Sequence, residues 1–273
     1  MQRVLLAILW IVLGTASAGA DSSEDEAKAA YASGDYTRAA VLTRPFAEQG
    51  QVWAQKNLGW MYQNGKGVPK LVMEAVMWYR KAAEQGDAWA QNNLGSMYDT
   101  GRGVPLDKEE AVVWYRKSAE QGNAWAQYSL GRMYQNGTAV SQDAKEWVTW
   151  IRKAAEQGLA DAQMYLGDIY YTGRGLLQDY SEAERWWQMA AAQGVEGARS
   201  NLGVMYEKTD RVRAYMWFSL LATLSSVNFS GPAQRSRNEL MSQMTAEEFT
   251  KAQEMARRCQ ETKFKDCGYK VHH

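Results

Sequence analysis

The sequence predicts an all-α protein, a solenoid of stacked helical hairpins of 36 residues each, and two repeated motifs carry this prediction. The tripeptide Glu-Gln-Gly occurs at 48–50, 84–86, 120–122 and 156–158, followed by Ala-Gln-Gly at 192–194. The dipeptide Leu-Gly keeps the same 36-residue interval, at 58–59, 94–95, 130–131, 166–167 and 202–203. A fixed period of about 20–50 residues is typical of stacked supersecondary units, each of which contacts only its neighbours.

The first half of the unit 87–122 has the pattern of a helix. Ala90, Leu94 and Tyr98 are four residues apart, so they share one side of a helix. Gly95 lies on the flank of this side, where the missing Cβ would let a neighbouring backbone approach closely. Gly101 is expected to end the helix, because glycine readily adopts the left-handed conformation of a helix C-cap.

The second half of the same unit predicts another helix. Asp107 is expected to cap its N-terminus, and Glu110, three residues later, would complete a capping box. Its apolar stripe consists of Ala111, Trp114, Tyr115, Ser118 and Ala119. Each unit is therefore an antiparallel helical hairpin, which buries its apolar face only against a neighbour.

The units 51–86, 123–158 and 159–194 repeat this pattern with two departures. Trp147 replaces the small residue of the second helix in one unit, so the packing there is expected to differ. Leu71 stands where the other units have a capping Asp, so its helix is expected to lose that cap. Residues 195–224 form a degenerate fifth repeat, because the loop between its helices is five residues shorter.

The pattern A-x-x-x-L-G-x-x-Y-x-x-G-x-G-V, followed by a capping Asp and A-x-x-W-Y/W-x-x-A-A/S-x-x-G, resembles the Sel-one-like repeat family. These repeats are relatives of tetratricopeptide repeats. The resemblance implies a right-handed superhelical α-solenoid, in which the first helices of the units line the concave surface. It also implies an adaptor or scaffold role, without naming a partner.

The N-terminal residues 1–20 have the pattern of a cleaved signal peptide. Arg3 precedes a ten-residue apolar run, Val4–Leu13, and Ala18-Gly19-Ala20 matches a cleavage site with small residues. The run is shorter than the roughly 20 residues that span a bilayer. We expect a periplasmic or secreted mature chain without a membrane span; retention of the segment as an anchor is the alternative.

Both ends of the array are expected to carry capping helices. Residues 21–50 predict an N-terminal capping hairpin, in which Pro45 should end or kink the second helix near Arg44. Residues 225–273 predict C-terminal capping helices and a tail, with a helix at about 233–241 and a capping box that begins at Thr245. Cys259 and Cys267 are the only cysteines, and in an oxidising compartment such a pair favours a disulfide over free thiols or a redox role.

Several function classes lack the residues that they need. Lys and Arg number 31 against 31 Asp and Glu, without a basic stripe, so nucleic-acid binding has no electrostatic support. The only histidines are His272 and His273, which removes histidine-based triads and zinc sites from the folded body. The chain has no Ser-x-x-Lys motif and no phosphate-binding loop. We therefore predict no catalytic residue, no metal and no cofactor.

The first helices present a polar and aromatic face on the side opposite their core. With Leu58 at the centre of the core, 100° per residue places Trp53, Lys56 and Trp60 on the far side. Over three units, the predicted partner-binding residues are Trp53, Lys56, Trp60, Trp89, Asn92, Asp99, Trp125, Tyr128 and Arg132. In the fourth unit the same face carries Asp161, Met164, Asp168 and Tyr171.

The tryptophans of this face have two interpretations. Trp53, Trp89 and Trp125 form a ladder, one per repeat, that either faces a ligand or seals the junctions between repeats. The second helices carry another series on their apolar stripes, which we assign to the core: Trp78, Trp114, Trp150 and Trp186.

The leading prediction is a non-catalytic periplasmic scaffold that binds a partner protein through its concave surface. The resemblance suggests envelope regulation, including restraint of a membrane sensor kinase, or assembly of secretion or polysaccharide machinery. The alternative is a carbohydrate- or peptidoglycan-binding module, because an aromatic ladder also suits sugar rings. A third hypothesis is a cell-wall enzyme with a carboxylate pair, such as Glu109/Glu110 or Glu182/Glu184, although these residues fit helix caps and solvent faces.

Overall fold

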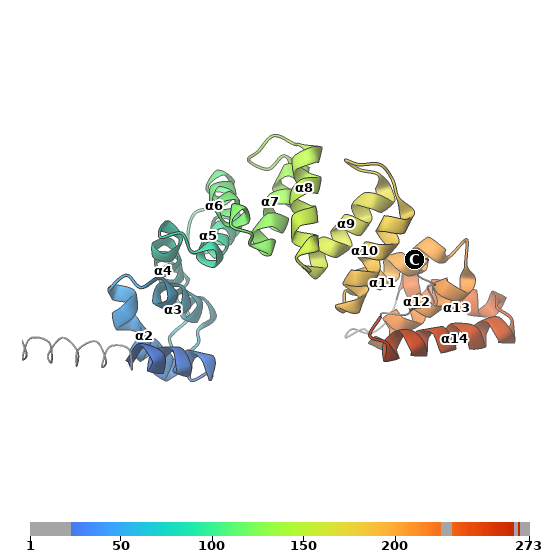
Figure 1. Ribbon diagram of the computed structural model, residues 1–273, viewed down its shortest axis with the longest axis horizontal. Coiled ribbons are helices and arrows are strands. Elements are labelled where there is room, and N and C mark those ends of the chain that lie inside the picture. The colour runs from blue at the N-terminus through green and yellow to red at the C-terminus, as the bar shows by residue number, and fades with distance from the viewer. Residues whose placement is uncertain (1–22, 225–230, 265–266, 268–273) are drawn as a thin grey trace, which may run out of the picture. The chain divides into compact units, whose positions relative to one another are not determined.

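The computed structural model describes residues 23–224, 231–264 and 267, and all the regular structure in them is helical (Figure 1). The chain divides into two compact units. The first contains the residues up to Leu130 together with Thr138–Val140, and the second contains Gly131–Gly137 and the residues from Ser141 onward. The predicted signal peptide, 1–20, lies outside the described residues.

In the first unit, a helix over 23–32 and α2 (Tyr36–Glu48) form a hairpin that precedes the repeats. The repeat helices are α3 (Val52–Asn64), α4 (Val72–Glu84), α5 (Ala88–Thr100), α6 (Lys108–Glu120) and the first part of α7 (Ala124–Asn136). Each of α2, α3, α4 and α5 packs against the helix that follows it. One hydrophobic core therefore continues from hairpin to hairpin.

The second unit contains the rest of α7 and the helices down to the C-terminal end. They are α8 (Ala144–Glu156), α9 (Ala160–Thr172), α10 (Tyr180–Ala192), α11 (Glu196–Tyr206), α12 (Arg211–Leu224), α13 (Pro232–Gln243) and α14 (Ala246–Glu261). Successive helices from α8 to α12 pack on one another, and α12 also contacts both α13 and α14. The predicted all-α solenoid of helical hairpins is thus confirmed within each unit.

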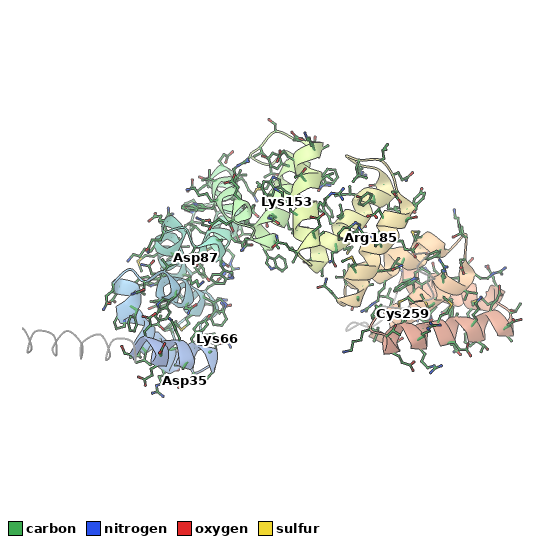
Figure 2. All side chains as sticks on the ribbon, in the orientation of Figure 1. Asp35, Lys66, Asp87, Lys153, Arg185 and Cys259 are labelled. Carbon is green, nitrogen blue, oxygen red and sulfur yellow. A yellow bond between two sulfur atoms is a disulfide. The ribbon has the colours of Figure 1, made fainter. Side chains whose placement is uncertain are left out.

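The C-terminal helices pack against the core of the last repeat. Thr245 and Glu248 form the predicted capping box at the start of α14. Cys259 of α14 (Figure 2) is joined to Cys267 in the predicted disulfide, and both cysteines are buried. Leu240 of α13 and Ala252 of α14 belong to the same core as α10, α11 and α12.

The helix caps confirm two predictions and correct a third. Asp107 caps α6 by accepting a hydrogen bond from the Glu110 backbone N–H at 2.9 Å, whereas Leu71 gives α4 no side-chain cap. The carboxylate of Glu110, however, does not complete the predicted capping box. It accepts a hydrogen bond from Trp114 Nε1 at 2.8 Å, because the buried indole N–H one turn later needs an acceptor.

The glycine of the Leu-Gly motif makes room for a side chain and not, as predicted, for a neighbouring backbone. A Cβ atom on Gly95 would stand 2.9 Å from Cδ1 of Tyr115, and one on Gly59 would stand 2.7 Å from Cδ1 of Tyr79. Both distances are shorter than van der Waals contact. The motif therefore seats a ring of the second helix on the backbone of the first.

Contrary to the prediction, Pro45 does not end α2 near Arg44. α2 continues through Pro45 to Glu48. Pro45 lacks the N–H that would donate to the Val41 carbonyl, and this loss is tolerated because Val41 lies on the exposed side of the helix. The last turn still closes, since Gln49 N donates to the Pro45 carbonyl at 3.0 Å and Gln51 N donates to the Phe46 carbonyl at 3.0 Å. The fully buried Ala47 also holds this turn in the core.

A buried glutamine links the first helix of each of the four full repeats to the end of the preceding hairpin. Gln55 Nε2 donates to the Ala47 carbonyl at 3.2 Å, and Gln91 Nε2 donates to the Ala83 carbonyl at 3.1 Å. Gln127 and Gln163 make the same bond, to Ala119 and Ala155. The glutamine of the Glu-Gln-Gly motif then donates to the buried one, as Gln121 does to Gln91 at 2.8 Å.

We predict that replacing Gln91 by Leu destabilises the protein by about 1–3 kcal/mol, because two hydrogen bonds are lost, from Gln91 to the Ala83 carbonyl and from Gln121 to Gln91. Replacing the exposed Gln121 by Ala keeps the first of these bonds and should cost no more than about 1 kcal/mol. Urea-unfolding midpoints of the two variants test the difference. Equal midpoints would contradict a stabilising role for the buried hydrogen bond.

Candidate functional site

The first tryptophan of the predicted ladder belongs to a junction. The ring of Trp53 packs against Phe46 of α2 with a centroid distance of 5.6 Å, and Lys28 Nζ lies 5.1 Å from its centroid. Trp60, on the same face of α3, contacts Tyr31 and Tyr36 at 5.6 and 5.2 Å. Both tryptophans are half-buried by the N-terminal hairpin, which matches the junction interpretation for this repeat.

The next two tryptophans of the ladder are exposed. Trp89 of α5 is 38% exposed and touches Tyr79 edge-on at 5.5 Å, and Trp125 of α7 is 54% exposed. Asn92, one helical turn after Trp89, is half-buried. The first unit therefore presents two large aromatic surfaces at equivalent positions of consecutive repeats.

The charged members of the predicted face have partners within the chain. Lys56 Nζ pairs with Asp87 Oδ2 at 3.1 Å, and Asp87 is also the N-cap of α5 (Figure 2). Asp99 Oδ1 pairs with Lys108 Nζ at 2.6 Å. These ion pairs join one helix to another within the first unit. The neutral side chains of this face are therefore the ones that remain for a partner.

The last two predicted residues lie on α7, where the boundary between the units falls. Tyr128 is half-buried and belongs to the first unit, whereas Arg132 is exposed and belongs to the second. The described candidate surface therefore comprises Trp89, Asn92, Trp125 and Tyr128, all within the first unit. We call these four residues the tryptophan face.

The tryptophans of the second helices are core residues, as predicted. Trp114 is 6% exposed, and its ring carries Lys117 Nζ at 4.3 Å. The corresponding indoles of Trp150 and Trp186 also donate to a glutamate four residues earlier. Glu110 and Glu182 accept such bonds, so one carboxylate of each pair in the enzyme hypothesis serves the packing of the helices.

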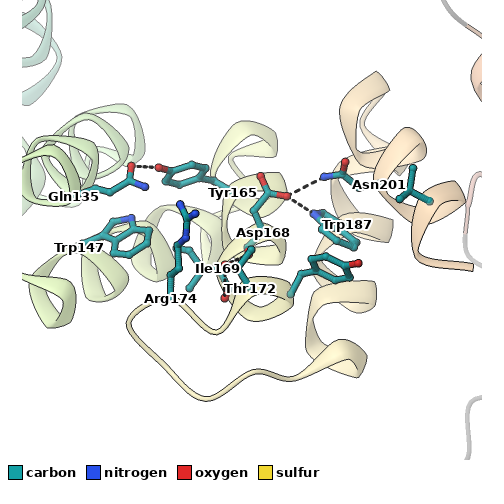
Figure 3. Close-up of a pocket in the computed structure, with 11 residues that line it drawn as sticks. Gln135, Trp147, Tyr165, Asp168, Ile169, Thr172, Arg174, Trp187 and Asn201 are labelled. Carbon is teal, nitrogen blue, oxygen red and sulfur yellow. Dashed lines mark hydrogen bonds between the residues drawn. The ribbon is translucent and has the colours of Figure 1, made fainter. Parts of the chain in front are cut away.

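The second unit contains a pocket of about 400 Å³ lined by side chains of α7 to α11 (Figure 3). Its walls are aromatic. Trp147 and Tyr165 lie 6.3 Å apart, and Tyr171 lies 5.2 Å from Trp187, measured between ring centroids. Asp168, which the helical pattern places on the outward face of α9, lies between these two aromatic pairs (Figure 3).

Asp168 is the polar centre of the pocket. Its Oδ1 accepts hydrogen bonds from Trp187 Nε1 at 3.0 Å and from Asn201 Nδ2 at 2.8 Å. Burial raises the pKa of this carboxyl above its usual value, and the two hydrogen bonds oppose that rise. Nearby, the Tyr165 hydroxyl donates to Gln135 Oε1 (Figure 3).

Arg174 brings further donors to the pocket, and Trp147 lies buried in its wall. Arg174 rises from the loop between α9 and α10 toward Trp147 and Tyr165, and it is exposed (Figure 3). Trp147 is buried, and its Nε1 has no hydrogen-bond partner among the described residues. One feature of this site is visible in the sequence, the replacement of a small residue by Trp147. Helical periodicity alone does not show that a cavity results.

Within the described ranges, no helix has both the length and the apolar character to cross a membrane. The same residues contain no group of three or more histidine, cysteine or acidic side chains placed to hold a metal ion.

The stacked hairpins define a helical-repeat scaffold, and comparison with known proteins identifies its family. The Sel1 repeat model matches residues 54–87, 90–123, 126–159, 160–195 and 198–226, so the chain belongs to the Sel1 repeat family. The fifth, shortened repeat is included in this match. Proteins of this family are generally non-catalytic scaffolds.

Two solved structures are similar over most of the chain. A protective antigen of uropathogenic Escherichia coli strains, which displays an SLR fold, shares 36% identity over 85% of this chain with a TM-score of 0.74. The chain spans 50% of the length of that protein. A Sel1 repeat protein from Oxalobacter formigenes shares 34% identity, over 74% of this chain and 85% of its own, with a TM-score of 0.68. Among the curated proteins, the comparison finds no match.

We predict that Trp114→Ala destabilises the protein by about 3–5 kcal/mol, because it empties a core position. Trp89→Ala should cost only about 0.5–1.5 kcal/mol, the contribution of its edge contact with Tyr79. Chemical unfolding of the purified variants measures both. Equal losses of stability would show that Trp89 seals a junction and would remove it from the tryptophan face.

Proposed function

We propose that the chain is a non-catalytic periplasmic scaffold that binds a partner protein through the tryptophan face. The exposure of Trp89 and Trp125 at equivalent positions carries this proposal. Trp and Tyr supply a large part of the binding energy in protein interfaces, because they bury much area with little loss of side-chain entropy.

The composition of the tryptophan face fits a protein partner. Its members are aromatic or amide side chains, and the charges beside it are neutralised by the Lys56–Asp87 and Lys108–Asp99 ion pairs. An interface with neutral aromatic anchors at its centre and paired charges around it avoids the cost of desolvating free ions. The repeat of 36 residues places one such anchor on each of two successive first helices.

We propose a partner in the cell envelope, a membrane sensor or a component of secretion or polysaccharide machinery. The apolar run and small-residue cleavage site in residues 1–20 support export. The similarity to a protective antigen of E. coli is consistent with a location outside the cytoplasm. N-terminal sequencing of the protein from a periplasmic fraction tests export: a mature chain that starts at Asp21 is expected, and an intact Met1 would contradict cleavage.

We predict that Trp89→Ala combined with Trp125→Ala lowers capture of the partner at least about tenfold, since two anchors of 1 kcal/mol or more are lost. The measurement is crosslinking in intact cells, affinity purification of the tagged full chain, and quantification of the proteins it retains. The double variant must first show the same helical content as the unaltered chain and a similar unfolding midpoint.

The matched control is Met77→Ala combined with Val113→Ala. These residues lie on the second helices of the two repeats that precede Trp89 and Trp125 and are 39% and 44% exposed, so their loss removes exposed apolar surface elsewhere. Capture by the control should equal that of the unaltered chain. Equal capture by both double variants, or equal loss, would refute binding through the tryptophan face.

Glycan binding is the second candidate function, because exposed tryptophans beside the Asn92 amide also suit sugar rings. Purified peptidoglycan fragments, incubated with the unaltered chain and with the tryptophan double variant, separate the two. Retention of fragments by the unaltered chain alone, without a captured protein, would replace the protein partner with a glycan.

A further inference from the structure

The pocket of the second unit is built by residues that depart from the repeat. Trp147 occupies the position at which the other units have Ala75, Ala111 and Ala183. Asp168 stands where the preceding units have Trp60, Ser96 and Arg132. The packing of hairpins does not require these two side chains, since the other repeats fold without them.

Asp168 has one oxygen that is left for a ligand. Both of its hydrogen bonds, from Trp187 and Asn201, end on Oδ1, and Oδ2 has no partner within the described residues. Partly buried carboxylates are costly unless their oxygens are bonded or paired with a cation. Burial raises the pKa of this carboxyl, because a partly buried carboxylate is solvated by water only in part.

Arg174 brings the opposite charge to the same cavity. Its guanidinium makes no ion pair within the described residues, with Asp168 or with any other carboxylate there. Figure 3 shows its side chain directed toward the space between Trp147 and Asp168. The pocket thus holds a negatively charged carboxylate oxygen that can accept a hydrogen bond, Asp168 Oδ2, and the positively charged guanidinium of Arg174, whose N–H groups can donate.

This balance of charge selects the chemistry of the ligand. A cation would suit Asp168 but would meet Arg174, and an anion would suit Arg174 but would meet Asp168. A neutral molecule with several hydroxyl groups satisfies both, because each hydroxyl donates to a carboxylate oxygen and accepts from a guanidinium N–H. The half-buried rings of Tyr171 and Tyr165 offer apolar surface to the C–H groups of a sugar ring, and the buried Trp187 and Trp147 pack beside them.

We propose that this pocket binds a neutral saccharide, with Asp168 and Arg174 as its hydrogen-bonding residues and Tyr171 and Tyr165 as its ring-contacting residues. Its volume, about 400 Å³, lies in the range of small-ligand pockets and fits one or two sugar rings. The site is separate from the tryptophan face, so it does not depend on the function proposed above.

Titration of the full mature chain with maltotriose, cellotriose and triacetylchitotriose, followed by calorimetry, tests this site. At least one of the three should bind with a dissociation constant in the millimolar range or below. Arg174→Ala should weaken that binding about tenfold or more, the effect of losing charge-assisted hydrogen bonds. Because Arg174 is exposed on a loop, this variant should keep its fold.

Asp168→Asn is the second variant and should weaken binding similarly, since the amide replaces an acceptor with a donor. Asp161→Asn is the matched control, because Asp161 is exposed on the first turn of the same helix, and it should leave affinity unchanged. Trp89→Ala with Trp125→Ala should also leave it unchanged, so that a failed tryptophan face and a failed pocket give different results.

Three results would overturn the proposal. The first is the absence of heat with all three saccharides. The second is saccharide binding that both Arg174→Ala and Asp168→Asn leave intact. The third is preferential binding of free arginine or glutamate, added as zwitterionic probes, which would assign the pocket to an amino-acid ligand instead.

Discussion

The stacking of this protein depends on a hydrogen bond that recurs with the repeat. The last turn of each second helix exposes a carbonyl to the next hairpin, at Ala47, Ala83, Ala119 and Ala155. Each of these carbonyls also accepts from the backbone N–H of the glycine three residues later, as Ala83 does from Gly86 at 3.0 Å. A glutamine of the following first helix donates to the second lone pair, and its buried amide would cost free energy without that acceptor. The bond therefore fixes the position of one hairpin on another, while alanines and leucines supply the apolar contact.

The last repeat shows how the same requirement is met differently. Arg199 takes the place of the glutamine, and its Nη2 donates to the Ala191 carbonyl at 3.1 Å. Burial lowers the pKa of the guanidinium, which is nearly inaccessible to water. The ring of Phe264 lies 5.3 Å from it, so the C-terminal segment covers the junction between the fourth and fifth repeats.

Much of the fold follows from the sequence because the interactions that build it are local or repeat with the period. The caps at Asp107 and Thr245 and the missing cap at Leu71 depend on residues within one turn. The hydrogen-bond partner of the Glu110 carboxylate was not predictable in the same way, because the backbone N–H of the N-cap and the indole N–H of Trp114 compete for this one acceptor. The outcome depends on how deeply Trp114 is buried, which periodicity does not give.

The predicted ladder shows the same limit at the site. Helical periodicity places Trp53, Trp89 and Trp125 on equivalent faces, but the neighbours of those faces differ. The N-terminal hairpin covers Trp53 and leaves Trp89 exposed, because that hairpin contributes Phe46 and Lys28 only at the first junction. Side chains at equivalent positions of the repeats therefore lie on the same helix face, whereas their exposure depends on which segment packs on that face in each repeat.

Two residues that depart from the repeat, Trp147 and Asp168, line the pocket of the second unit. An alanine at position 147 would satisfy the packing of a second helix, as Ala111 does, yet a tryptophan stands there with a buried indole N–H that lacks an acceptor. Asp168 likewise carries a partly buried charge that the neighbouring hairpins manage without. The unpaired indole N–H is not peculiar to this position, because Trp78 in the core of the first repeat has one as well. The partly buried charge of Asp168 is the departure that packing does not explain, and the proposed saccharide site therefore rests chiefly on this residue.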